Sequence, residues 1–135
     1  MIYVLDTNAV SALMKGTTAV VERLTATEPA HVAVPQPVIA EIAYGIKRLP
    51  HSKRRTALQA RFDLVCAELP REEWTDTVSD TYGRIKATLE KQGTRIEDFD
   101  AAIAAHALAI NATLVTANLA QMNRIPGLRI ENWSR

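Results

Sequence analysis

The chain has a single cysteine and few aromatic residues, and each shortage excludes a class of structure. Only Cys66 is a cysteine among 135 residues, so an internal disulfide and a thiolate metal site are excluded. Cys66 stands in an apolar stretch, which predicts a buried, inert thiol. Aromatic residues make up 5% of the chain although 47% of it is hydrophobic. The core must therefore consist of Ala, Val, Ile and Leu, which favours buried parallel strands under close-packed helices.

Long apolar runs are also missing. The first one is interrupted at Asp6, which argues against a signal peptide. The Ala-rich run from Ala101 to Val115 is too short for a membrane span and contains His106. Together with the lone cysteine, these features predict a soluble cytoplasmic protein that does not enter a membrane.

The chain lacks a strong net charge, but its charges are unevenly distributed. A formal charge of +1 gives no general attraction to nucleic acid. Residues 42 to 62, however, contain no acid and carry six basic residues: Lys47, Arg48, Lys53, Arg54, Arg55 and Arg61. This segment is either a solvated helix pair or a stripe that contacts phosphates, and composition alone does not decide between them.

The chain alternates between short apolar runs and amphipathic segments. The apolar runs predict strands at residues 2–5, 31–34, 67–69, 114–116 and 128–130. The periodic segments predict helices at residues 9–14, 19–24, 37–48, 73–92 and 99–110, and one more that begins after Ser52. Gly93 is expected to end the fifth of these six helices, and Asp98 to cap the sixth. This α/β alternation predicts a parallel sheet between helical layers, with ligands bound beyond the carboxyl ends of the strands.

Three acids stand at positions that suit such a ligand site. Asp6 directly follows the first predicted strand, Glu41 lies among apolar residues of a predicted helix, and Asp100 lies in the first turn of another. Each has an ordinary alternative: a helix cap for Asp6, a solvent-facing glutamate for Glu41, and a favourable interaction with the helix dipole for Asp100. Taken singly, none of the three identifies a function.

Five short motifs in a fixed order decide between these alternatives. They are Leu5-Asp6-Thr7-Asn8; Glu41 with Tyr44-Gly45-Ile46; Asp100-Ala101-Ala102-Ile103-Ala104-Ala105-His106-Ala107; Leu114-Val115-Thr116-Ala117-Asn118; and Ile125-Pro126-Gly127-Leu128 with Glu131-Asn132-Trp133. In this order and spacing the chain resembles the PIN-domain family, specifically its VapC branch of toxin ribonucleases, over essentially its whole length. The resemblance implies one PIN domain across residues 1–135, an α/β/α sandwich with parallel strand order 3-2-1-4-5.

The resemblance also implies a site and a reaction. Acids that match Asp6, Glu41 and Asp100 hold Mg²⁺ or Mn²⁺ in the family, which cleaves RNA to leave 3′-hydroxyl and 5′-phosphate ends. Carboxylates repel a phosphodiester, but a divalent cation held between them reverses the local charge and acidifies a bound water. Five further residues are expected to support the site: Thr7, Asn8, Thr116, Asn118 and Asp98.

The sequence departs from the family pattern in one segment. Many relatives carry a fourth acid shortly after the fourth strand, where this chain has Asn118, and Gln121-Met122 stands where an acid–Phe pair is common. A neutral Asn can orient water or phosphate but adds no charge. This weighs against a second metal site and leaves the three-acid set intact.

Several functions were weighed. The leading hypothesis is a metal-dependent toxin endoribonuclease acting on structured RNA such as tRNA; the main alternative is an RNA-binding PIN-like module with weak or no cleavage. A receiver-type phosphoacceptor domain would need an Asp after the third strand, where the chain reads Glu68-Leu69-Pro70. A histidine-based ribonuclease is disfavoured because the three histidines show no evident acid–base pairing, and His106 is expected to be structural or to lie on the surface.

The resemblance also suggests partners. Proteins of the VapC branch are usually homodimers, and a small VapB-type antitoxin inhibits them by inserting a basic side chain into the acidic pocket. A cation there can take the place of the metal's charge. We further expect Lys47, Arg48, Lys53, Arg54 and Arg55 to position the RNA backbone.

Overall fold

The strands form one parallel sheet, and their order is the one expected. The computed structural model describes residues 1–134. Its five strands lie in the order β3-β2-β1-β4-β5, so β1 is central. Every pairing is parallel. The strands are β1 (Tyr3–Leu5), β2 (Val32–Pro35), β3 (Arg71–Glu72), β4 (Thr113–Val115) and β5 (Arg129–Glu131).

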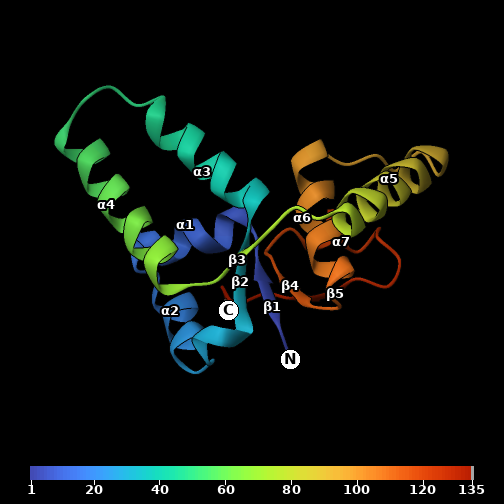
Figure 1. Ribbon diagram of the computed structural model, residues 1–135, viewed down its shortest axis with the longest axis horizontal. Helices are drawn as coiled ribbons and strands as arrows, with labels where there is room; N and C mark the ends of the chain where they lie inside the picture. Colours follow the sequence, from blue (N-terminus) through green and yellow to red (C-terminus); the bar gives the residue numbers. More distant parts are fainter. Residues whose placement is uncertain (135) are drawn as a thin grey trace.

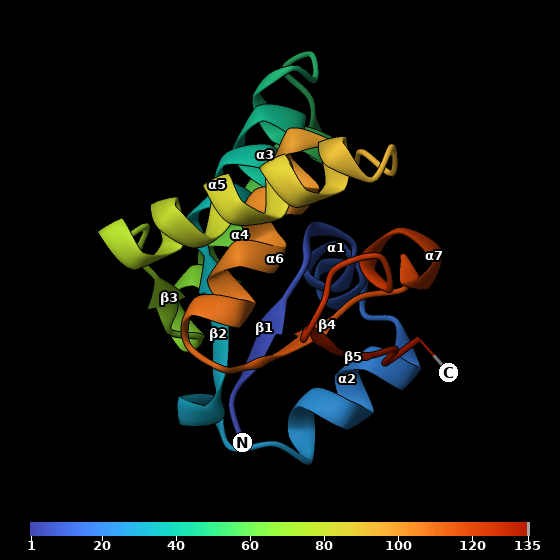
Figure 2. The same ribbon diagram turned by 90° about the vertical axis from the view of Figure 1, so that its right-hand side faces the viewer.

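Helices cover both sides of this sheet. They are α1 (Thr7–Lys15), α2 (Thr18–Thr25), α3 (Gln36–Lys47), α4 (Lys53–Glu68), α5 (Asp76–Lys91), α6 (Asp98–Ala109) and α7 (Leu119–Met122), with a 3₁₀ turn at Pro29–His31. In Figure 1, α1, α2 and α4 lie on one side of the strands, and α5 and α6 on the other. Figure 2 shows α6 lying over β1, with which it is in contact. The α/β/α fold class predicted from the sequence is confirmed. No helix within residues 1–134 is both long and apolar enough to cross a membrane.

The third predicted strand was placed wrongly. Residues 67–69 were expected to form it, but α4 continues through Glu68, and β3 comes only after Pro70. Arg71 and Glu72 pair with Val34 and Pro35 of β2. A two-residue strand at the edge of a sheet needs no apolar side chains. The pattern of apolar residues in the sequence therefore could not indicate β3.

Two helix starts also differ from expectation. Helix α5 begins at Asp76 rather than residue 73, because the Thr75 hydroxyl accepts a hydrogen bond from Val78 N at 3.3 Å and caps it. Asp98 does not cap α6: the cap residue is Glu97, which forms no side-chain capping bond, and Asp98 is helical. Gly93 ends α5 as expected, with φ +72° and its N–H donated to Glu90 O.

The core is aliphatic, as the composition predicted. The central strands contribute Val4, Leu5, Leu114 and Val115, all buried, and alanines of α6 pack closely over them. Cys66 is only partly buried at the edge of this core, not fully buried as expected. It stands on α4, an outer helix whose only fully buried residue is Phe62.

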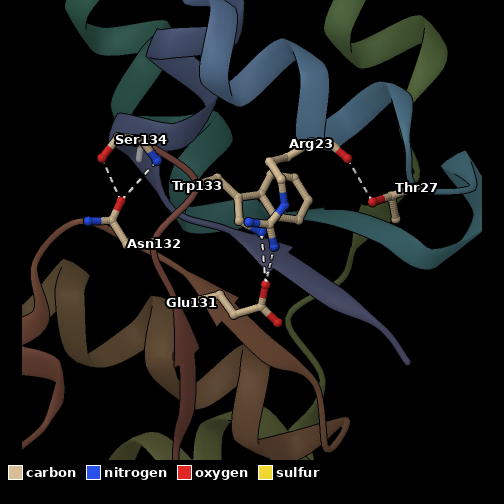
Figure 3. A network of polar contacts seen from close by, with 6 residues as sticks. All are labelled: Arg23, Thr27, Glu131, Asn132, Trp133 and Ser134. Carbon is tan, nitrogen blue, oxygen red and sulfur yellow. Dashed lines mark hydrogen bonds and ion pairs between the residues drawn. The ribbon is translucent and has the colours of Figure 1, made fainter.

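A polar network joins α2 to the segment that follows β5. Arg23 Nη2 lies 2.6 Å from Glu131 Oε1, and the Arg23 guanidinium sits over the Trp133 ring at 5.5 Å from its centroid. Trp133 Nε1 donates to the same carboxylate oxygen at 3.2 Å (Figure 3). The Trp133 ring also packs against Tyr3 of β1, with centroids 5.2 Å apart. The last strand is thereby tied to the first strand and to α2.

His106 is the one expected structural histidine, and it lies in the core. Its side chain on α6 is fully buried, and both ring nitrogens lack a hydrogen-bond partner. The edge of the Trp74 ring meets it at 5.6 Å between centroids. Burial lowers the pKa of His106 to about 4, because a charged imidazolium there would be desolvated.

We expect His106 to make the fold acid-sensitive. The unfolded chain takes up a proton near pH 6.5 while the folded chain does not until about pH 4. Stability is therefore complete above pH 6.5 and is lost as the pH falls toward 4. Against His106→Leu, the wild type should lose on the order of 2 kcal/mol between pH 6.5 and 5. Urea unfolding at both pH values measures this, and parallel pH profiles for the two proteins would contradict it.

Candidate active site

The three predicted acids lie within electrostatic reach of one another near the carboxyl end of β1. This is the point where the strand order reverses, because β1 continues to β2 on one side and β4 lies on the other. Helices α3 and α6 are in contact there and supply the two remaining acids. In Figure 1, α3 and the first turn of α6 lie beyond the same end of the sheet as the carboxyl end of β1. The fold therefore brings together residues 35 and 94 positions away from Asp6 in the sequence.

Asp6 is buried at the junction of β1 and α1. Its carboxylate caps α1 by accepting a hydrogen bond from Ala9 N at 2.8 Å. Asp6 therefore caps α1, as the ordinary alternative predicted, and its role in the site stays a prediction. Burial raises the pKa of Asp6, and the negative charge of Glu41 raises it further, against hydrogen bonds from Thr116 and the Ala9 and Asn8 amides that favour the anion.

Glu41 is held in place by Thr7. The Thr7 hydroxyl donates to Glu41 Oε1 at 2.6 Å, so the first residue of α1 anchors an acid on α3. Glu41 is half-buried, as its apolar neighbours in the sequence suggested. Thr7, which directly follows Asp6, therefore fixes the position of the Glu41 carboxylate.

Asp100 completes the group from the first turn of α6. It is half-buried. Burial raises the pKa of Asp100, and repulsion from Glu41, Asp6 and Glu97 adds to the effect. Four ion pairs occur within residues 1–134, and none of them reaches Asp6, Glu41 or Asp100. The three carboxylates thus repel one another without a neutralising basic side chain.

The donor set suits a hard divalent cation, although it is not a finished cage. Over the described part of the chain, no three His, Cys, Asp or Glu side chains converge closely enough to enclose a metal ion. Mg²⁺ needs only one or two protein carboxylates, with water completing its shell. Burial and repulsion raise the pKa of both Asp6 and Asp100, so a bound cation would favour the charged form of each. The residues present therefore fit such an ion.

Of the expected supporting residues, Thr7, Thr116 and the Asn8 backbone contact the acids, whereas the Asn118 side chain does not. Thr7 binds Glu41, and the buried Thr116 hydroxyl favours the Asp6 anion and accepts a hydrogen bond from Asn118 N at 2.9 Å. Asn118 turns its own amide to Gln121, with Nδ2 donating to Oε1 at 2.9 Å. Asn8 contributes its backbone N–H to Asp6 while its side chain is exposed.

Asp98 belongs to a different contact. It is exposed, and its carboxylate lies 3.2 Å from Lys86 Nζ on α5. This pair joins α5 to α6 beside the acids, and it raises the pKa of Lys86. Asp98 was expected to support the site, but its ion pair is with Lys86, and no hydrogen bond or ion pair within residues 1–134 joins it to Asp6, Glu41 or Asp100.

The basic residues lie around the turn between α3 and α4. Lys47, Arg48, Lys53 and Arg54 are exposed there. Arg55 is half-buried, and its Nη1 donates to Leu49 O at 3.2 Å, which braces the turn. Arg48 stacks on Tyr44 at 5.9 Å from the ring centroid. Of the group, Arg54 lines a groove that also contains Glu41.

Two polar residues of that groove were not predicted from the sequence. Ser11 and Lys15 line it together with Thr7. The three are spaced four residues apart, which places them on one face of α1. That spacing was a readable signal, since the face begins at the residue next to Asp6.

Comparisons with known proteins identify the family of the chain. Residues 3–128 match the PIN domain model. The chain is 35% identical to Ribonuclease VapC2 of Rickettsia felis over the full length of both proteins. It is 27% identical to the tRNA(fMet)-specific endonuclease VapC of Salmonella typhimurium, with 97% of each chain covered. Among solved structures, VapBC2 of Rickettsia felis bound to a promoter DNA fragment contains a chain that superposes with a TM-score of 0.87 at 33% identity, covering 98% of this chain and 99% of that one.

Proposed function

This chain belongs to the PIN-domain family, in its VapC branch, and from that premise we propose that it is the toxin endoribonuclease of a VapBC-type toxin–antitoxin pair. The observation that carries the proposal is the group formed by Asp6, Glu41 and Asp100. Three mutually repelling carboxylates at the switch point of the sheet cost folding free energy. Such an arrangement is expected where charge is needed for function.

The proposed chemistry is metal-dependent hydrolysis of a phosphodiester. Asp6 and Asp100 would hold Mg²⁺ or Mn²⁺, which when bound neutralises phosphate charge and acidifies a water molecule. Thr7 holds Glu41 through Oε1, leaving Oε2 to accept a hydrogen bond from water. Burial raises the pKa of Asp6, and hydrogen bonds from Thr116 and the Ala9 and Asn8 amides oppose that shift by favouring the anion. These contacts fix the acids before substrate arrives, so little reorganisation accompanies the reaction.

The substrate we propose is structured RNA, with tRNA as the first candidate. The name of the Salmonella typhimurium relative specifies tRNA(fMet). The exposed basic residues at the α3–α4 turn supply charge for backbone contacts. Action on cellular RNA agrees with the cytoplasmic location expected from the sequence.

We also propose two protein partners. A VapB-type antitoxin is the first, because the similar solved structures include VapBC assemblies. A second copy of this chain is the other. Exposed apolar side chains, among them Tyr44, Trp74 and Phe99, provide surface for such contacts.

The test is cleavage of purified tRNA and of total cellular RNA with Mg²⁺, with Mn²⁺ and with EDTA. We expect discrete metal-dependent cuts, reduced by about 100-fold or more in Asp6→Asn. Asn is itself a good helix cap, so α1 should remain capped in this variant. Asp80→Asn is the matched control, because Asp80 is an exposed acid on α5 paired with Arg84.

The outcomes distinguish a nuclease from a non-catalytic RNA-binding module. Cuts that need metal, persist in Asp80→Asn and vanish in Asp6→Asn support the nuclease. Intact RNA in every condition, with RNA binding retained, would refute cleavage and favour the non-catalytic RNA-binding module. In that case the neutral Asn118, whose amide is already engaged with Gln121, would be the first residue to replace with Asp.

A further inference from the structure

A groove of about 310 Å³ runs along α1, and Glu41 is the member of the acid group that lines it. One end is marked by Glu41 and Thr7, which are bonded to each other. Its walls are α1 on one side and the α3–α4 hairpin on the other, elements that contact one another. The groove thus shares Glu41 and Thr7 with the proposed active site, whereas Asp6 and Asp100 do not line it.

The far end of the groove is positively charged. Lys15 and Arg54 line it, and both side chains are exposed. Neither takes part in an ion pair with any residue between 1 and 134. Ser11 also lines the groove, one helical turn from both Thr7 and Lys15. Along α1, Thr7 and Lys15 are eight residues apart, a rise of about 12 Å.

The floor of the groove contains a helical glycine. A Cβ at Gly45 would meet no atom within 4 Å, and its φ is not in the left-handed region. Backbone conformation therefore does not require glycine at this position. The missing side chain leaves space in the groove beside Glu41.

We propose that this groove binds the RNA backbone next to the scissile phosphate, with Lys15 and Arg54 contacting phosphates and Ser11 a sugar or phosphate oxygen. The inference rests on the proposed function. An RNA whose scissile phosphate lies at the acids must continue beyond them, and the groove offers hydroxyl and cationic groups in that direction. Its apolar remainder can accept the faces of ribose and base.

Gly45→Leu tests the groove by filling it. Leucine is a good helix former, and its side chain would enter open space. We expect the affinity for fluorescein-labelled tRNA, measured in EDTA to prevent cleavage, to fall about 10-fold or more. The matched control is Gly83→Leu, because Gly83 is also helical with no atom near its Cβ and lies on α5 away from the groove. Thermal melts of both variants check the fold.

Lys15→Ala and Arg54→Ala test the charges. Each lost phosphate contact should flatten the dependence of log affinity on log salt by about 0.7 to 0.9. The substitution Arg84→Ala, on α5, removes an equal charge elsewhere and should leave the RNA affinity within about twofold. A loss of affinity without a change of salt slope would overturn the assignment of phosphate contacts.

Failure of this inference is distinct from failure of the proposed function. If wild type cuts RNA but Gly45→Leu, Lys15→Ala and Arg54→Ala bind tRNA normally, the nuclease stands and the groove proposal is overturned. The same result together with lost inhibition by the antitoxin would assign the groove to a protein segment instead. If wild type does not cut but the variants lose RNA affinity, the groove proposal stands and cleavage is refuted.

Discussion

Asp100→Asn is expected to stop RNA cleavage and at the same time to raise the melting temperature of the metal-free protein. Burial and repulsion from Glu41, Asp6 and Glu97 raise the pKa of Asp100. An acid whose folded pKa is raised costs stability at every pH above that pKa, since the unfolded chain bears the charge more easily. Asparagine removes the charge and with it the cost. Cleavage should fall by about 100-fold or more, while the melting temperature rises by a few degrees.

A bound metal ion should reverse the order of the two melting temperatures. Added Mg²⁺ or Mn²⁺ should raise the melting temperature of wild type by binding only the folded state, and should raise that of Asp100→Asn much less. Glu90→Gln on α5 is the control, because this acid is exposed and outside the group. A lower melting temperature of Asp100→Asn in metal-free buffer would mean that Asp100 forms a stabilising contact. Retained cleavage would remove Asp100 from the site.

Trp133→Ala is expected to have the largest effect on stability, about 3–5 kcal/mol. The Trp133 side chain is 2% exposed. It packs on Tyr3, lies under the Arg23 guanidinium and donates a hydrogen bond to Glu131. Its loss leaves a large cavity and releases Arg23 and Glu131 from a shared contact. Urea unfolding followed by circular dichroism measures the change.

The other tryptophan provides the control. Trp74 is 44% exposed, so Trp74→Ala removes less buried surface and should cost less than half as much. It does lose a hydrogen bond to Ser79 and the contact with His106. If the two variants lost equal free energy of unfolding, the contacts of Trp133 with Tyr3, Arg23 and Glu131 would not contribute the expected extra stability.

The central part of the fold could be predicted because its signals are local. Strands β1 and β4 are apolar runs bounded by polar residues, and Ser52 and Gly93 act at helix ends as their chemistry suggests. The edge strand could not be predicted from an apolar pattern, since Arg71 and Glu72 become a strand only by pairing with β2. Asp98 has the chemistry of a cap, and only the packed structure reveals Lys86 as its partner.

The site was predictable to a similar extent. The positions of Asp6, Glu41 and Asp100 were named from motifs, and the fold brings them within electrostatic reach of one another. Two facts depended on three-dimensional packing: the bond from Thr7 to Glu41, and the groove that joins Glu41 to Lys15 and Arg54. Residues of three separate helices form that groove, so no single sequence window contains it.

Because β1 is central in the sheet, the site around Asp6 cannot form during synthesis until β4 has also been made. Asp6 leaves the ribosome before β4 is made, but its backbone N–H bonds to Val115 O and its carboxylate accepts a hydrogen bond from Thr116. At roughly 10 residues per second, about 10 s of translation separate these partners. A nascent chain therefore carries its first acid without a working site, and cellular RNA is not exposed to cleavage until β4 has been made.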